Sequence, residues 1–130
     1  MKRASVLFLI VLATVCLVSF GFAAVDRDAI KKQVDEIVAA IDGGKSADDF
    51  KAAAKREPYY VFIMKEDGLL LVHPSLEGQN LKEKAGPVFD AVARATFEGL
   101  WVDYEWQGKM KHSYVRKTKG ALIVGSGYSD

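Results

Sequence analysis

The sequence has a single cysteine, Cys16, and that residue lies in an apolar stretch near the amino terminus. From residue 24 onward there is no thiol, so this part of the chain can form no disulfide, no thiolate metal site and no cysteine nucleophile. Covalent haem of the c type is excluded too, because the Cys-x-x-Cys-His motif is missing. A domain of this composition must be stabilised by the packing of its core.

Signals for catalysis and for nucleic-acid binding are also missing. The net charge is only +1, and no block of like charge indicates nucleic acid or an anionic membrane surface as a partner. The two histidines, His73 and His112, do not have metal-ligand spacing, and there is no nucleophile elbow or phosphate loop. The glycines of 125–127 are more typical of close packing in a strand. We therefore expect no enzyme and no cofactor, with non-covalent haem on His73 as a minor alternative.

The amino terminus has the pattern of a secretory signal. Lys2 and Arg3 precede 22 uncharged residues, 4–25, and small residues occupy the positions expected before a cleavage site. This pattern predicts a signal peptide at 1–23 and one exported, periplasmic domain at 24–130. The alternative is an uncleaved membrane anchor at 4–25, because about 20 apolar residues can span a bilayer. Both alternatives place the domain outside the cytoplasm.

The remainder of the chain has the patterns of an α+β domain. Apolar spacing and helix-start signals predict helices at 26–42 and 47–55 and a third from Pro87 to Gly99. Alternating apolar residues separated by turn signals predict five strands, at 59–65, 69–73, 100–107, 110–118 and 121–129. Short turns make consecutive strands antiparallel. The expected fold is a five-stranded antiparallel sheet with N-terminal helices, one helix between strands 2 and 3, and all helices on one side.

Several stretches, taken in order, carry a family resemblance. The segment YYVFIMKEDGLLLVHPSLEGQNL combines an aromatic strand, an acidic-Gly turn, an apolar strand ending in His-Pro, and a Gly-x-Asn loop. Later come GLWVDYEW, HSYVRKT and ALIVGSGYS. Together they resemble the single Cache domain of type 2, a PAS-like extracellular sensor domain. The resemblance covers about residues 27–130 and implies a PAS-like arrangement of the predicted sheet.

The resemblance also implies a function. Domains of this family bind small molecules outside the cell, often small carboxylates, and usually form the outer part of a membrane receptor. Because no second apolar span or signalling segment follows within the sequence, we expect a free-standing binding module that acts with a signalling or uptake partner. The alternative is an interaction module, with no ligand of its own, that docks on a membrane receptor or forms a homodimer through the first helix.

His73 is the first candidate ligand-binding residue, because it ends an apolar strand immediately before Pro74. One interpretation is that its ring anchors the backbone of 75–80. The other is that the ring donates a hydrogen bond to a carboxylate ligand at the rim of a pocket, beneath a loop that includes Gly78 and Asn80. The resemblance favours the second interpretation, since the family's His-Pro pair lies beside its pocket.

The other candidates are aromatic and basic residues on the strands. Tyr104 and Trp106 share a strand face and are expected to wall the pocket, whereas Tyr114 and Arg116 are expected to supply polar contacts. Lys117 points to the opposite face from Arg116, so at most one of these two should touch the ligand. Alternation also predicts that Lys111 lies on the face opposite Arg116 and makes no contact. Tyr59 and Tyr60 point to opposite faces of their strand, and the sequence does not show which of them lines the pocket. The full candidate set is His73, Tyr60, Tyr104, Trp106, Tyr114, Arg116 and Lys117.

Overall fold

The computed structural model describes residues 24–130, so the predicted signal peptide at 1–23 lies outside the described residues. Helix α2 (Arg27–Asp42) begins at Asp26, whose carboxylate accepts the backbone N–H of Ala29. It is followed by the 3-10 helix η2 (Ala47–Lys55), where the side chain of Asp49 accepts the N–H of Ser46. Both helices occupy the predicted ranges to within one residue.

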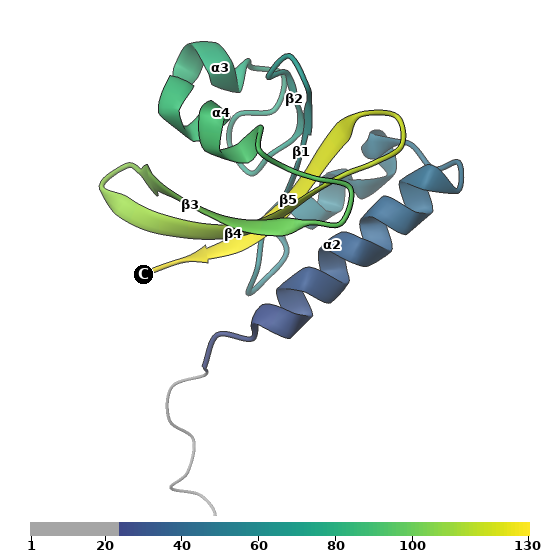
Figure 1. The fold of residues 1–130 in the computed structure, drawn as a ribbon, viewed down its shortest axis with the longest axis horizontal. Helices are drawn as coiled ribbons and strands as arrows, with labels where there is room; N and C mark the ends of the chain where they lie inside the picture. Colours follow the sequence, from purple (N-terminus) through teal and green to yellow (C-terminus); the bar gives the residue numbers. More distant parts are fainter. Residues whose placement is uncertain (1–23) are drawn as a thin grey trace, which may run out of the picture.

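The sheet has the five predicted antiparallel strands, in the order β2-β1-β5-β4-β3. Their bounds are β1 (Val61–Lys65), β2 (Leu70–Val72), β3 (Leu100–Trp106), β4 (Lys109–Lys117) and β5 (Leu122–Ser129). The chain places the first hairpin beside the last strand, so β5 lies in the centre of the sheet (Figure 1). Between β2 and β3 the predicted helix is α4 (Gly86–Val92), which ends seven residues before the predicted stop at Gly99, and the four-residue helix α3 (Leu81–Lys84) precedes it.

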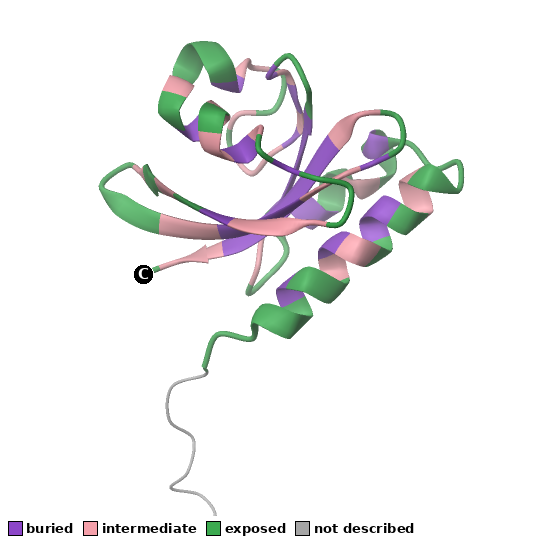
Figure 2. Ribbon diagram, in the orientation of Figure 1, coloured by how far each residue is buried: buried purple, intermediate pink, exposed green. Residues whose placement is uncertain are grey.

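The helices cover both faces of the sheet, and the prediction that they share one side was wrong. The apolar stripe of α2 packs against one face, on residues such as Val61 and Val124. Helix α4 packs against the other face, through Val88 and Val92 (Figures 1 and 2). The reason is that central strands such as β1 and β5 are apolar on both faces, so each face must be covered by a helix.

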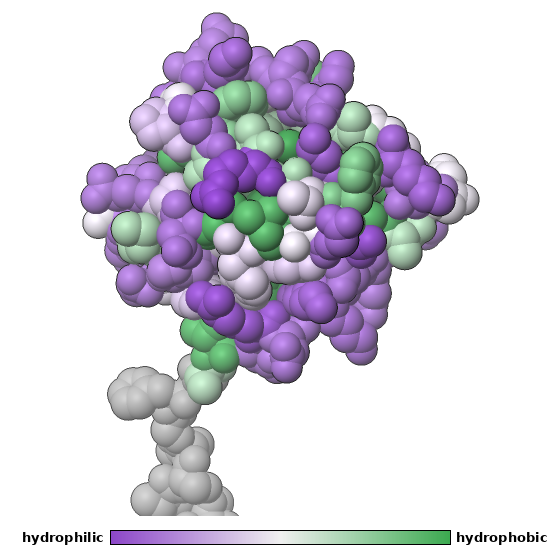
Figure 3. Space-filling view, in the orientation of Figure 1, coloured by the Kyte–Doolittle hydropathy of each residue, from purple (hydrophilic) through white to green (hydrophobic). Residues whose placement is uncertain are grey.

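The first helix uses its apolar residues within the domain. Ile30, Val34, Ile37 and Val38 are buried, and the outward face of α2 is polar. The face drawn in Figure 3 is largely hydrophilic, with apolar side chains only in small separate areas. Among residues 24–130, no helix is both long and apolar enough to cross a membrane.

Two glycines of β5 are positions of close packing, as predicted for 125–127. A methyl group added at Gly125 would overlap the ring of Phe62, which lies opposite it on β1. At Gly127 the methyl group would overlap the backbone of β4 at His112. The absence of side chains at these two positions therefore lets β1 and β4 pair closely with β5.

Candidate functional site

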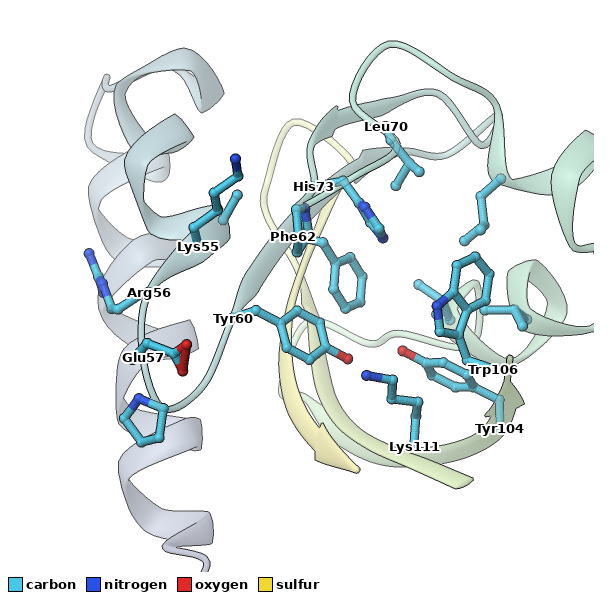
Figure 4. Close-up of a pocket in the computed structure, with 16 residues that line it drawn as sticks. Lys55, Arg56, Glu57, Tyr60, Phe62, Leu70, His73, Tyr104, Trp106 and Lys111 are labelled. Carbon is cyan, nitrogen blue, oxygen red and sulfur yellow. The ribbon is translucent and has the colours of Figure 1, made fainter. Parts of the chain in front are cut away.

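A cavity of about 500 Å³ lies on the α4 side of the sheet (Figure 4). The sheet contributes side chains from the first hairpin and from the β3–β4 hairpin, and α3 and α4 close the cavity from above. The segment that joins η2 to β1, residues 55–58, forms part of the mouth. The cavity is thus lined by parts of the chain that are far apart in sequence, and it is open to solvent at the mouth.

One end of the cavity is polar. The hydroxyls of Tyr60 and Tyr104 and the ammonium group of Lys111 converge there (Figure 4). Tyr104 lies directly opposite Lys111 in the β3–β4 register, and its hydroxyl is hydrogen-bonded to that of Ser113 at 3.0 Å. The Lys111 Nζ atom lies 4.8 Å from the centre of the Tyr60 ring. Burial raises the pKa of both tyrosines, so both hydroxyls keep their protons and can donate hydrogen bonds.

Lys111 carries the positive charge of this end. Burial, with the nearby charge of Lys109, lowers the pKa of Lys111. Within residues 24–130, Lys111 makes no ion pair with any Asp or Glu. A partly desolvated ammonium group without a carboxylate partner attracts an anion, because an opposite charge restores the interaction lost from water.

His73 has two roles in this geometry. Its Nδ1 atom accepts the backbone N–H groups of Ser75 at 3.0 Å and Leu76 at 2.9 Å. A nitrogen that accepts these bonds carries no proton, so the neutral ring is protonated on Nε2. Because the ring also lines the cavity, Nε2–H is the nitrogen available to a ligand (Figure 4). The anchoring and ligand-donor interpretations of His73 are therefore compatible, since they use different nitrogens.

The rest of the cavity is mainly apolar. Phe62 and Leu70 come from the sheet, and Leu81, Val88 and Val92 come from the two short helices. The Trp106 ring stands at the side, with its centre 6.3 Å from that of His73. At the mouth, Lys55, Arg56 and Glu57 are exposed, and Arg56 donates to the side chain of Gln33 on α2 at 2.6 Å.

The structure brings four of the seven predicted site residues together. Tyr60, His73, Tyr104 and Trp106 all line the cavity. The neighbour of Tyr60, Tyr59, points the other way, and its hydroxyl accepts the backbone N–H of Asp26 at the start of α2.

The other three predicted residues do not line the cavity. Tyr114 is buried beneath α2 on the opposite face of the sheet, and its hydroxyl donates to the carbonyl of Glu98 at 3.0 Å. Arg116 lies on that same face, where it pairs with Asp35 of α2 at 3.0 Å. It ties α2 to the sheet and has no free charge for a ligand.

Lys117 lies on the face of β4 that the cavity uses, but at the far end of the strand from Lys111. Its ammonium group pairs with Glu66 at 3.1 Å. Ser75 and Asn80 are turn residues outside the cavity, and Asn80 caps α3 through its side-chain oxygen. The loop through Gly78 and Asn80 is held against β2, because the N–H of Gly78 donates to the carbonyl of Leu70 at 2.8 Å.

Lys111 is the important residue that the sequence analysis missed. Residues directly opposite each other in an antiparallel hairpin point to the same face. In the observed register even-numbered residues of β3 face odd-numbered residues of β4, so Tyr104 shares its face with Lys111 and not with Arg116. The short turn at 107–108 carried this information. The expected placement of Lys111 and Arg116 is therefore reversed.

The protonation of His73 predicts a dependence of stability on pH. Burial, and then the charge of Lys111, lowers the pKa of His73 from 6.5 to about 4. Below pH 6.5 the unfolded chain binds a proton that the folded domain does not, so we expect stability to be full above this pH and to fall towards pH 4. Urea unfolding at a series of pH values measures this dependence.

The His73→Asn variant is the control, and its stability should fall less steeply across this window. His112 acts in the opposite direction, because hydrogen bonds to Asp103 and Asp130 raise its pKa. Its stabilising contribution is present at low pH and is lost as the pH rises above its folded pKa. If the stability of the wild type and that of His73→Asn fall equally steeply between pH 6.5 and pH 4, protonation of His73 is not the cause of the loss of stability in acid.

Comparison with known proteins places the fold. The structure is similar to the crystal structure of a methyl-accepting chemotaxis protein from Vibrio parahaemolyticus, with a TM-score of 0.53 and 19% identity. The match covers 79% of this chain and 87% of the other. The two chains share a fold. The sequence matches no family model and no curated protein.

A second solved structure, the ligand-binding domain of Mlp24 with asparagine, is less similar to this chain. Its TM-score is 0.38 at 16% identity, and the match covers 55% of this chain and 28% of the other. A similarity this low does not support a conclusion about the fold or the function of this chain. The inference of function therefore depends on the cavity itself, with the shared fold as context.

Proposed function

We propose that this chain is a small-molecule-binding sensor module, of the single Cache type, whose ligand is a small organic acid. The observation that carries the proposal is Lys111, an ammonium group without a carboxylate partner among residues 24–130, which points into a cavity that is open to solvent at its mouth. Around it, Tyr60 and Tyr104 offer hydroxyl donors and His73 offers Nε2–H. A carboxylate is the simplest anion that satisfies one cation and several neutral donors at once.

The proposed role is binding without chemistry, followed by transmission to a partner. The fold shared with a methyl-accepting chemotaxis protein supports a sensor role, as does the resemblance of the strand segments to Cache domains. The partner would be a membrane receptor or an uptake system outside the cytoplasm. The exported location is proposed on the basis of the charge-free segment after Lys2 and Arg3.

Calorimetric titration tests the binding proposal. The protein, purified after expression of the full chain, is titrated with acetate, propanoate, butanoate and lactate and with the corresponding amides. We expect one or more acids to bind with 1:1 stoichiometry and the amides to bind at least tenfold more weakly. If neither acids nor amides bind and the protein is a stable dimer, the interaction module without a ligand becomes the better explanation.

His73 should contribute to binding through Nε2–H. An asparagine side chain can accept backbone N–H groups two or three residues ahead, as Asp67 does for Leu69 in this chain. His73→Asn should therefore keep much of the loop anchor while removing the donor, and binding of butanoate should weaken about tenfold, the effect of one hydrogen bond to a charged group. Calorimetry measures the affinity, and thermal unfolding measures the stability.

The alanine variant separates the two roles of the ring. His73→Ala removes both the donor and the anchor, so it should bind as weakly as His73→Asn and also unfold more easily, by about 1 kcal/mol. If His73→Asn binds butanoate like the wild type while His73→Ala is less stable, the ring is an anchor only.

Export predicts a shortened chain. The residues before Asp26 have the basic, apolar and small-residue regions of a signal, so the protein recovered from the periplasmic fraction should begin at Ala24. Amino-terminal sequencing checks this. Recovery of intact protein starting at Met1 from the membrane fraction would indicate the anchor at 4–25 instead.

A further inference from the structure

The cavity has polar groups at one end and a mainly apolar lining elsewhere. This difference between its two ends limits the chemical class of the ligand more than the presence of Lys111 alone does. The polar groups at one end are those of Tyr60, Tyr104 and Lys111, which converge in Figure 4. Away from that end, Phe62, Leu70 and the aliphatic side chains of α3 and α4 line the cavity. A ligand that fills the cavity must therefore be an anion at one end and apolar over the rest of its length.

The size of the cavity excludes the smallest acids as good fits. Its volume is about 500 Å³, which corresponds to roughly 15 water molecules at about 30 Å³ each. An acid with two carbon atoms would satisfy Lys111 and leave the apolar part without a partner. Burial of apolar ligand surface is the main favourable term available in that part.

The charges that line the cavity make amino acids and dicarboxylic acids poor ligands. Among the described residues, Glu57 is the only acidic residue that lines the cavity, and it is exposed at the mouth, so these residues offer no carboxylate to an α-ammonium group in the interior. Within the part of the chain that the structure describes, Lys111 is the only lysine or arginine of the lining that is not exposed. A second carboxylate in the interior would therefore lie against apolar side chains, away from the exposed Lys55 and Arg56 at the mouth. An unpaired charge in such surroundings is strongly unfavourable.

We infer that the ligand is an amphipathic monocarboxylate, with an apolar body of about five to ten carbon atoms and no α-ammonium group. This inference rests on the proposed function, because it needs the carboxylate end to bind at Lys111. The carboxylate accepts hydrogen bonds from Lys111, from the two tyrosines and from Nε2–H of His73. The apolar body extends towards Leu81 and Val88, where a straight, branched or aromatic body can be accommodated.

A chain-length series tests the inference on the unaltered protein. Acetate, butanoate, hexanoate and 3-phenylpropanoate are titrated by calorimetry, with hexanamide, phenylalanine and hexanedioate as controls. Each added methylene should tighten binding about threefold to fourfold, so hexanoate should bind on the order of a hundredfold more tightly than acetate. Hexanamide, phenylalanine and hexanedioate should each bind at least tenfold more weakly than their monocarboxylate counterparts.

The Val88→Leu variant adds one methylene to the apolar end of the cavity. It should weaken hexanoate binding severalfold more than acetate binding, because acetate occupies only the end near Lys111. An equal change for both acids would show that the variant acts through general stability, and it would contradict the proposed position of the apolar body. The series on the unaltered protein does not depend on how this variant folds.

The outcomes distinguish failure of this inference from failure of the proposed function. Equal affinities for acetate and hexanoate, or tighter binding of phenylalanine or hexanedioate, overturn the amphipathic ligand and leave a carboxylate site in place. Equal affinities for hexanoate and hexanamide overturn carboxylate recognition, and with it both proposals. If affinity rises with the length of the acid and hexanoate binds more tightly than hexanamide, both proposals are supported.

Discussion

Replacement of Lys111 by methionine should weaken the binding of butanoate on the order of 30- to 150-fold. Methionine keeps most of the length of the side chain and its contact with the Tyr60 ring, but it removes the only positive charge that residues 24–130 place in the interior of the cavity. A hydrogen bond to a charged group contributes about 2–3 kcal/mol where water is partly excluded, which gives this range of affinity. Calorimetric titration of the variant measures the change.

The Lys109→Met variant is the matched control. Lys109 lies two residues away on the same face of β4, but it is exposed and does not line the cavity. Its loss should change butanoate affinity less than threefold, through the long-range effect of one charge. Stability of the Lys111 variant should be equal to or higher than that of the wild type, since burial disfavours the ammonium form. Equal losses in both variants would mean that the cavity does not bind the carboxylate at Lys111.

A second large effect is expected for Gly127→Ala, which should destabilise the domain by about 3 kcal/mol, at the upper end of the usual cost of overpacking. The added methyl group would overlap the carbonyl of His112 and lie 2.9 Å from the Cα atom of Ser113. These are backbone atoms of β4, held by pairing with strands on both sides, and they cannot move without lengthening ladder hydrogen bonds. The midpoint of thermal unfolding should fall on the order of 15 °C.

Gly125→Ala is the comparison, because the same methyl group there would meet a side chain. It would overlap the ring of Phe62, which borders the cavity and has empty space into which it can shift. We expect a loss of about 1 kcal/mol in stability, together with weaker hexanoate binding from the reduced volume. If Gly125→Ala were as destabilising as Gly127→Ala, the Phe62 ring would not be able to move into the cavity to make room for the methyl group.

The sequence alone was sufficient to predict the class of fold, the five strands and the first two helices, but not the short helix α3 or the end of α4. The period of apolar residues located α2 and η2, and the Asp-Gly turn before Leu69 located the first hairpin, since these signals are local and depend on backbone preferences. The end of a strand at His73-Pro74 pointed to one wall of the cavity for a similar reason. Proline stops the ladder at that point, so the histidine before it stands at an edge.

Only part of the cavity lining could be predicted from the sequence. Prediction of the rest requires knowing which face of β4 lies on the same side of the sheet as Tyr104 of β3. Alternation along β4 correctly separated Lys111 from Arg116, but alternation within one strand does not say which set lies with Tyr104. The hairpin register supplies that link, and it pairs Tyr104 with Lys111. Matching the two strands across the short turn at 107–108 identifies Lys111 from the sequence as well, because the length of a hairpin turn fixes the register.

What only the tertiary structure decided is which face of the sheet is hollow. Both faces carry apolar and aromatic residues, so composition does not distinguish them. The long helix α2, together with η2, packs against one face, and Tyr114 and Arg116 serve to hold α2. The short helices α3 and α4 cannot fill the other face, which leaves the cavity above Tyr60, Tyr104 and Lys111. This outcome depends on the lengths and packing positions of helices far apart in the chain, and no local pattern encodes it.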